Sequence, residues 1–233
     1  MELFPNVNQD LGIPYAQPPL GALRFLPPQP FPLSSSIINA TTMPPACPQI
    51  KDTTYPFFQY VPETLPLGSF SEECLTLNIC TPSNATASSN LPVIIWIYGG
   101  AFVQGSLDTP AWIQTSQAHI VVAVQYRRNI FGFPGAARAL EHQNLGILDQ
   151  RRAVEWARAA LTCTTSRSWR TSSGRDLFAT RGLAFLAVDT RSTNSASGNF
   201  SAVARGLGRA TEVPGDELDC MRRKPFDEIV GRC

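Results

Sequence analysis

Histidine and serine are the side chains through which this chain could act as a nucleophilic catalyst. Its 233 residues include two histidines, His119 and His142. A serine is a weak nucleophile unless a base is positioned beside it, and histidine is the usual base near neutral pH. His119 precedes an apolar run and His142 lies in a polar stretch. We therefore predict that each histidine is a surface or structural residue, and not a catalytic base.

Other arrangements for nucleophilic catalysis are no better supported. A Ser-x-x-Lys site is excluded, because Pro48 and Met221 stand three positions before the two lysines. Ser173-Gly174 and Ser197-Gly198 lie in a stretch of low complexity, and we expect neither serine to be a nucleophile. We expect the same of Cys163 paired with a histidine. The residue types alone therefore identify no catalytic residue.

Cysteine spacing bears on metal and redox chemistry. No pair among the six cysteines has the C-x-x-C spacing; they are Cys47, Cys74, Cys80, Cys163, Cys220 and Cys233. A zinc site or a thioredoxin-like site is therefore not predicted. The sequence indicates neither a metal nor a cofactor.

Composition limits the classes of partner. A hydrophobic content of 43 % is ordinary for a globular domain, whereas a charged content of 16 % lies below the usual ~25 %. The net charge of +1 does not by itself indicate a nucleic acid or a membrane surface as partner. Residues 161–210 are locally basic, with seven arginines and two aspartates. Aromatic residues are sparse among these arginines, so we predict a solvated segment and no nucleic-acid partner.

Targeting signals give mixed indications. No apolar run approaches the ~20 residues of a membrane helix, and the N-terminus lacks the features of a signal peptide. Three Asn-x-Ser/Thr sequons begin at Asn39, Asn84 and Asn199. With the cysteines, they suggest a secreted ancestor.

Apolar patterning predicts the elements that would position a site. The runs 93–98 and 120–126 are typical of strands buried on both faces, and the alternation over 75–79 predicts a half-buried strand. The seven-residue spacing within 147–161 predicts a helix. Strand, helix, strand and helix in this order indicate an α/β fold with a parallel sheet.

Less regular segments surround these elements. The proline-dense stretch 12–32 predicts extended loop rather than helix. We also expect a helix near 109–118, a strand within 183–188 and a polar helix over 201–207.

Five segments of the chain carry a recognisable combination of motifs: residues 12–28, 71–79, 91–102, 126–133 and 144–150. Together, and in this order, they resemble the type-B carboxylesterases and lipases, the cholinesterase-like branch of the α/β-hydrolases. The resemblance implies a partial α/β-hydrolase fold with a mostly parallel sheet and flanking helices. It also implies hydrolysis of small carboxylic esters through an acyl-serine intermediate, with no cofactor.

The resemblance assigns roles to a few positions. Gly99, Gly100 and Ala101 match the oxyanion loop, in which backbone N–H groups of Gly100 and Ala101 would stabilise the tetrahedral intermediate. A bare Gly-Gly is otherwise a turn that ends a strand. Cys47 and Cys74 match the family's first disulfide, with two free thiols as the alternative in a reducing compartment. Cys220 matches half of a second disulfide, but Arg209 stands at the position of its partner.

The family's nucleophile elbow, G-x-S-x-G, does not occur. No two of the 16 glycines are four positions apart. In the family the helix at 147–161 leads into that elbow, whereas here a Ser-, Thr- and Arg-rich stretch follows, and the resemblance returns near Gly182. We expect residues 1–161 to be the N-terminal part of the domain, 162–181 an aberrant and disordered segment, and 182–233 a later, incomplete segment of the same domain.

These expectations describe a truncated member of the family. The family's opening strands before Gly12 are expected to be missing, as are the segments that carry its catalytic acid and histidine. We predict a carboxylesterase or lipase by ancestry that is inactive as it stands. The alternatives are a non-catalytic interaction protein of the same family and the product of a defective gene model. The oligomeric state and the location are not predicted, although the family is often secreted.

Overall fold

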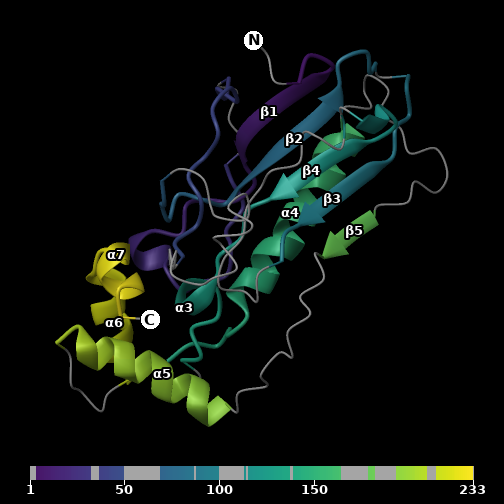
Figure 1. Cartoon of the computed structure of the whole chain (residues 1–233). Helices are drawn as coiled ribbons and strands as arrows, with labels where there is room; N and C mark the ends of the chain where they lie inside the picture. Colours follow the sequence, from purple (N-terminus) through teal and green to yellow (C-terminus); the bar gives the residue numbers. More distant parts are fainter. Residues whose placement is uncertain are drawn as a thin grey trace, which may run out of the picture.

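A five-stranded sheet with helices beside it and beyond one end forms the molecule (Figure 1). This computed structural model describes residues 4–32, 37–49, 69–86, 88–99, 113, 115–136, 139–163, 178–181, 193–208 and 214–232. The strands stand in the order β1-β2-β4-β3-β5. Their bounds are Val7–Pro14 for β1, Thr76–Pro82 for β2, Val93–Ile97 for β3, Ile120–Val124 for β4 and Phe178–Arg181 for β5.

The sheet is mixed, whereas the sequence predicted a mostly parallel one. β4 pairs in parallel with β3, and β3 with β5, but β1 pairs antiparallel with β2 and β2 antiparallel with β4. A long crossover joins β3 to β4, as a parallel pair requires. β2 and β3 are separated by a short polar turn, and β4 lies between them. The alternation at 75–79 predicts a strand but carries no information about its direction.

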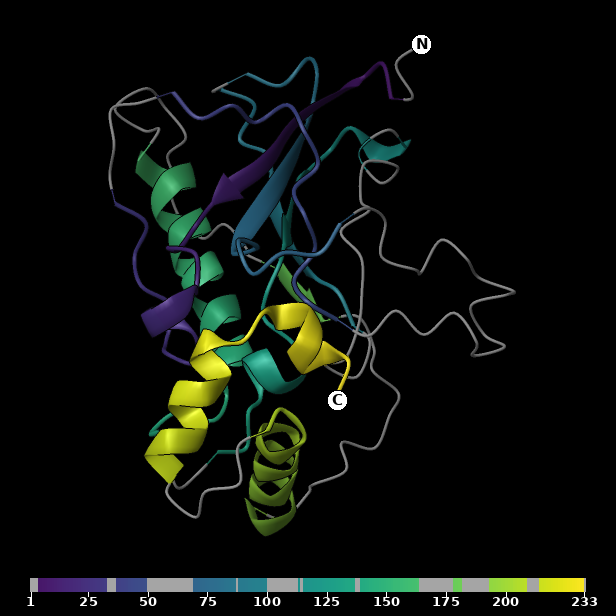
Figure 2. The same cartoon turned by 90° about the vertical axis from the view of Figure 1, so that its left-hand side faces the viewer.

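The main core lies between the sheet and helix α4 (Leu145–Cys163), which runs along one face (Figure 2). Ala153 and Ala157 of this helix are buried with Leu77, Ile95 and Val122 of the sheet. On the opposite face, Val121 packs with Cys80 and Ile113. All five residues of β4 are buried, because both faces of this strand are covered. The predicted helix and the predicted strands at 93–98 and 120–126 are confirmed, with ends that differ by one or two residues.

Strand β1 begins before Gly12, where no strand is predicted from the sequence. It is an edge strand, and its pairing with β2 shifts between Asp10 and Ile13. Gly12 lies at this irregularity with φ +73°, a conformation that favours glycine. Its N–H donates a hydrogen bond of 2.9 Å to Asn78 Oδ1 of β2. The bulge therefore retains a cross-strand contact.

A second core lies beyond the carboxyl ends of β3 and β4 (Figure 1). It gathers Phe25, which follows the short 3-10 helix η1 (Gly21–Leu23), and residues of several α-helices: α3 (Asn129–Gly132), α5 (Thr193–Gly206), α6 (Pro214–Arg223) and α7 (Phe226–Val230). The Phe25 ring stacks on Phe131 at 6.1 Å and meets Phe200 edge-on at 5.7 Å. Helices near the C-terminus thus share a core with residues near the N-terminus. The turn η1 lies inside 12–32, where no helix was expected.

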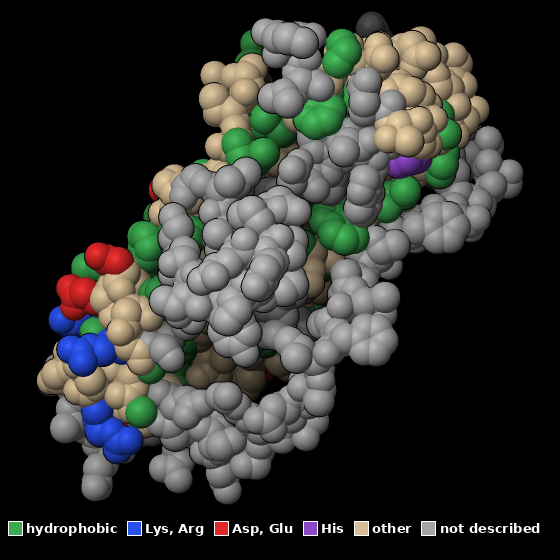
Figure 3. Space-filling model, in the orientation of Figure 1, with side chains coloured by type: hydrophobic (Ala, Val, Ile, Leu, Met, Phe, Trp, Pro, Cys, Tyr) green, Lys and Arg blue, Asp and Glu red, His purple; other side chains and the backbone are tan. Residues whose placement is uncertain are grey.

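Charged side chains gather over α6 and α7 (Figure 3). Asp216 and Glu217 occupy the first turn of α6, and Arg222 and Arg223 its last turn. This arrangement complements the helix dipole. Lys224 forms an exposed ion pair of 3.0 Å with Glu228. These helices therefore present a surface of mixed charge to solvent.

Several predictions fall wholly or partly outside the described residues. Of the segment 162–181, the structure describes the end of α4 and the strand β5, while the predicted strand at 183–188 lies outside the description. Most of the predicted helix near 109–118 also lies outside it. The helix predicted over 201–207 is confirmed as part of α5. Among the described helices, none is long and apolar enough to cross a membrane.

Candidate active site

The candidate oxyanion loop begins where β3 ends. Tyr98 follows the strand and is buried, and Gly99 follows it half-buried. Gly100 and Ala101 lie outside the described residues. Because β3 and β4 are parallel, their carboxyl ends meet at one edge of the sheet, the usual position of a binding site in α/β sheets. The structure therefore places the start of the loop at the edge where such a site is expected.

Tyr98 is held in place by hydrogen bonds to its backbone carbonyl and from its side-chain hydroxyl. The Tyr126 hydroxyl donates to the Tyr98 carbonyl oxygen at 2.9 Å. The Tyr98 hydroxyl donates to Gln125 Oε1 at 2.7 Å, and the Tyr15 hydroxyl donates to the Gln125 carbonyl at 2.6 Å. The rings of Tyr98 and Tyr126 stack with centroids 4.9 Å apart. The residue immediately before Gly99 is thus fixed to the loop that follows β4.

Two of these tyrosines have perturbed acidity. Burial raises the pKa of Tyr15 well above its usual value, and the charge of Asp149 raises it further, against the opposing effect of Arg127. Burial also raises the pKa of Tyr98, although Arg128 opposes this. Both hydroxyls therefore remain neutral hydrogen-bond donors at neutral pH.

Arg128 is a fully buried cation beneath the same aromatic pair. Its guanidinium carbon lies 4.6 Å from the centroid of the Tyr98 ring and 5.9 Å from that of Tyr126. At these distances the ring faces attract the positive charge. Its Nη1 donates to Gln49 Oε1 at 2.9 Å. Arg128 therefore packs against the side chain that anchors the candidate loop.

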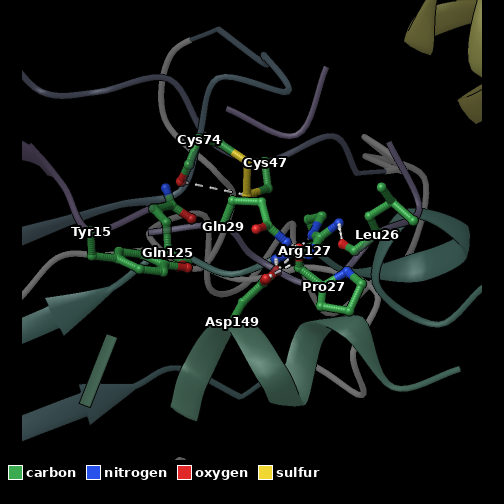
Figure 4. Close-up of polar contacts among 9 residues, drawn as sticks. All are labelled: Tyr15, Leu26, Pro27, Gln29, Cys47, Cys74, Gln125, Arg127 and Asp149. Atoms are coloured by element: carbon green, nitrogen blue, oxygen red, sulfur yellow. Dashed lines mark hydrogen bonds and ion pairs between the residues drawn. A yellow bond between two sulfur atoms is a disulfide. The ribbon is translucent and has the colours of Figure 1, made fainter. Parts of the chain in front are cut away.

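Arg127 joins the β4 loop to helix α4 (Figure 4). Its Nε and Nη2 donate to the two oxygens of Asp149 at 2.8 and 2.7 Å, and its backbone N–H donates to Oδ2 at 3.0 Å. Nη1 donates to the carbonyl of Leu26 at 2.9 Å. Burial lowers the pKa of Arg127, but the charge and hydrogen bonds of Asp149 outweigh it and raise the value overall. Both side chains are engaged in structural contacts.

A disulfide lies beside the short segment that carries Gln49, the residue that accepts a hydrogen bond from Arg128. Cys47 and Cys74 are joined in the structure, with their Cα atoms 5.0 Å apart. The next residue, Pro48, accepts a hydrogen bond of 2.8 Å from Asn129 Nδ2 at its carbonyl. Cys220 is a half-buried free thiol. The cross-link thus holds residues 47–49 against the loop that follows β4.

The two histidines lie elsewhere. His142 is exposed. His119 is half-buried, and its Nδ1 lies 3.0 Å from the Oγ of exposed Ser116. His119 directly precedes β4 and therefore lies at the amino end of this strand. Gly99 lies at the other end of the sheet, beside the carboxyl end of β4. At about 3.3 Å per residue, roughly 20 Å separates these two ends of the sheet. His119 therefore cannot serve chemistry at Gly99.

Other candidates stay unassigned. Ser173 lies outside the described residues, and of Ser197 and Cys163 only the helical backbone is described. Within the described parts of the chain, no three His, Cys, Asp or Glu side chains cluster as a metal site. The buried contacts of Tyr15, Gln125 and the two arginines were not predicted from the sequence. The signal available for them was position: Gln125 lies directly beside a resembling segment, and the other three lie within the segments 12–28 and 126–133.

Comparison with known proteins adds a second line of support. The carboxylesterase family profile matches residues 1–162. Secreted lipase 5 of Gibberella zeae is 33 % identical over 265 aligned residues, covering 95 % of this chain and 50 % of the lipase. Acetylcholinesterase of Bungarus fasciatus is 43 % identical over 156 residues, covering 65 % of the chain and 25 % of that enzyme. Chlorogenic acid esterase of Aspergillus niger is 40 % identical over 167 residues, covering 66 % and 32 %. The chain spans between a quarter and a half of the length of these relatives.

Proposed function

Because the chain belongs to the carboxylesterase family, we propose that it carries the oxyanion scaffold of a serine carboxylic ester hydrolase. In this proposal Gly99, Gly100 and Ala101 form the loop. The N–H groups of Gly100 and Ala101 would donate to the oxygen of a tetrahedral intermediate. In acyl transfer, one such donor typically contributes about 10²–10³-fold to the rate. The substrate class is a small carboxylic ester.

One observation carries this proposal: the hydrogen bond from Tyr126 to the carbonyl of Tyr98. An oxyanion hole works because its donors are oriented before the reaction begins. Fixing the carbonyl of Tyr98 limits rotation of the peptide that leads into Gly99. The stacked rings, with Arg128 against them, restrain the same residue from below.

We further propose that this chain does not itself hydrolyse esters. An oxyanion hole accelerates acyl transfer only when a nucleophile and its base are in place. The sequence has no G-x-S-x-G elbow, and His119 stands at the opposite edge of the sheet. The stretch aligned with the Gibberella lipase, 265 residues, is longer than this chain of 233. The lipase therefore has residues within the aligned region that this chain lacks.

The segment 162–181 is the proposed place of that loss. In this proposal residues 1–161 and 182–233 are two parts of one domain, and the segment between them replaces the elbow. A shifted reading frame or a misplaced splice junction would produce such a replacement. Translating the genomic DNA of this region in the three forward frames tests the idea. A strand followed by G-x-S-x-G in another frame would support it, whereas transcripts that match the chain and no such frame would refute it.

Activity-based labelling tests the proposed inactivity. A fluorophosphonate reacts with serines that a neighbouring base has activated. We expect the purified chain to take up no more label than the heat-denatured chain, and to hydrolyse aryl esters at the background rate. Stoichiometric labelling of one serine would overturn the proposal. Ser116→Ala and His119→Ala would then show whether the exposed Ser116–His119 contact is responsible.

A non-catalytic interaction protein is the second candidate. The packing of Phe200 on Phe25 favours it, because a recruited module must keep a complete core. A monomeric sample that melts cooperatively would support this candidate. Aggregation of the purified chain would instead favour the product of a defective gene model.

A further inference from the structure

We propose that Asn39 is a site of N-linked glycosylation. The side chain of Asn39 is exposed and opens the sequence Asn39-Ala40-Thr41. Asparagine followed at the second position by serine or threonine is the acceptor pattern for this modification. The proposal does not depend on the esterase assignment.

The local geometry suits a glycosyl acceptor. The Thr41 hydroxyl donates to Asn39 Oδ1 at 2.7 Å, and the Thr41 backbone N–H donates to the same oxygen at 3.2 Å. The turn therefore brings the hydroxyl that defines the acceptor pattern beside the amide that reacts. Both described contacts are at Oδ1, so Nδ2 does not have to break either of them to react.

The other two sequons differ from this one. Asn84 is exposed after β2, but the Thr86 hydroxyl lies 2.9 Å from Ser88 Oγ and 3.2 Å from Ser89 Oγ. Asn199 lies inside helix α5, and Phe200 beside it is buried in the second core. We therefore expect Asn39 to be the principal acceptor, Asn84 a weaker one, and Asn199 unmodified in the folded chain.

The disulfide points to a compartment in which this reaction occurs. Bonds such as Cys47–Cys74 form and persist in oxidising environments, including the lumen of the secretory pathway. Eukaryotic N-glycosylation takes place in the same lumen. The structure thus combines an exposed acceptor with an independent feature that is typical of proteins in an oxidising compartment.

Apolar side chains beside Asn39 give the modification a physical role. Ile37 is 99 % exposed, Ile38 47 % and Met43 52 %. Such a strip of exposed apolar residues favours association with other molecules. A glycan is bulky and solubilising, and one attached at Asn39 would lie within a few residues of all three side chains. We expect it to shield this strip.

The reaction requires a lipid-linked oligosaccharide diphosphate as donor. Asn39 Nδ2 forms a bond to the anomeric carbon of the donor sugar, while the bond between that carbon and the diphosphate oxygen breaks. The lipid diphosphate leaves with the electron pair of the broken bond. Nδ2 loses one proton to a base of the transferase, and no oxidation or reduction takes place.

The test uses the full chain, expressed in a yeast secretory host behind a host leader. A C-terminal tag with its own acceptor sequon identifies the molecules that entered the lumen, and only these are analysed. We expect peptide-N-glycosidase to increase the gel mobility of the wild-type chain beyond the change due to the tag. Mass spectrometry should then find Asn39 converted to aspartate.

Matched variants locate the acceptor. Asn39→Gln and Thr41→Ala should abolish the mobility change at this site, Thr41→Ser should retain it, and Asn199→Gln should leave it unaltered. The Asn39→Gln variant should also give a lower yield of soluble protein than the Asn84→Gln variant. An unmodified Asn39 in chains with a glycosylated tag would overturn the proposal, as would a glycan found only at Asn84 or Asn199.

Discussion

Arg24 ties the N-terminal part of the chain to the helices near the C-terminus, and removing it should destabilise the whole fold. Its side chain is 8 % exposed and forms a two-point ion pair with the carboxylate of Glu72, whose side chain is 6 % exposed. Its Nη1 also donates to the carbonyl oxygens of Met221 and Lys224, each at 2.6 Å. These carbonyls lie at the end of α6, where helix geometry provides no partner. Arg24→Met removes all of these contacts at once.

The structure gives the expected magnitude. Removing one partner of a buried ion pair costs about 3–5 kcal/mol, because the other charge remains buried without compensation. For a chain of this size that loss corresponds to a fall in Tm of roughly 6–20 °C. Replacing both partners, as in Arg24→Met with Glu72→Met, removes the uncompensated charge. The double variant then loses only the carbonyl contacts, at about 1–3 kcal/mol.

A matched substitution controls for the change in residue type. Arg151 is 75 % exposed on the side chain and pairs with Glu155 along α4. Exposed pairs of this kind contribute about 0–1 kcal/mol, so Arg151→Met should have little effect. Urea unfolding followed by circular dichroism measures the free energies, and limited proteolysis reports whether cleavage within 214–232 increases. Equal stability of Arg24→Met and Arg151→Met would refute the reasoning, as would a double variant less stable than Arg24→Met.

Two further predictions concern close packing and buried hydroxyls. Gly146→Ala should cost at least about 1–3 kcal/mol in urea unfolding, because a Cβ would lie 2.4 Å from the Arg127 carbonyl oxygen. Gly215→Ala has no atom within 4 Å of the new Cβ and should be neutral or stabilise by about 0.5–1 kcal/mol; equal losses would contradict this. Because the pKa of Tyr15 is raised in the folded chain, the unfolded chain releases the hydroxyl proton at lower pH. Ionisation of Tyr15 therefore leaves the free energy of unfolding unchanged below about pH 10 and lowers it by about 1.4 kcal/mol per pH unit above that pH. Tyr15→Phe should reduce that slope by the same amount, and an unaltered slope would show that Tyr15 does not titrate in this way.

Elements whose residues share one environment were predictable from the sequence. Val154 and Leu161 of α4 pack against the core that the helix shares with the sheet, and their seven-residue spacing, which begins at Ile147, predicts the helix. Strand β4 is buried on both faces, and its unbroken apolar run predicts the strand. Strand β1 was missed because it is an exposed edge with a bulge at Gly12, and its residues neither alternate nor form an apolar run.

The buried charges were not predictable in the same way. Arg24 and Glu72 are 48 positions apart, and Arg127 and Asp149 are 22 apart. The sequence shows that each of these four residues is charged, and a charged residue is expected at the surface. Only the fold brings the paired residues together in the interior. For the candidate loop, the motif indicated Gly99. The motif did not indicate that the Tyr126 hydroxyl fixes Tyr98, the residue before Gly99. That contact depends on the pairing of β3 with β4.

The hydrogen bond from Arg24 to Met221 has a consequence for folding during synthesis on the ribosome. The two residues are 197 positions apart, and translation at about 5–20 residues per second separates their synthesis by roughly 10–40 s. Phe25 likewise waits for Phe200, its edge-on partner in the second core. During that interval the nascent chain exposes an apolar face that helices α5 and α6 cover once they have been made. Folding of this region therefore waits for the synthesis of these helices, and the growing chain is a natural client for chaperones that bind exposed apolar segments.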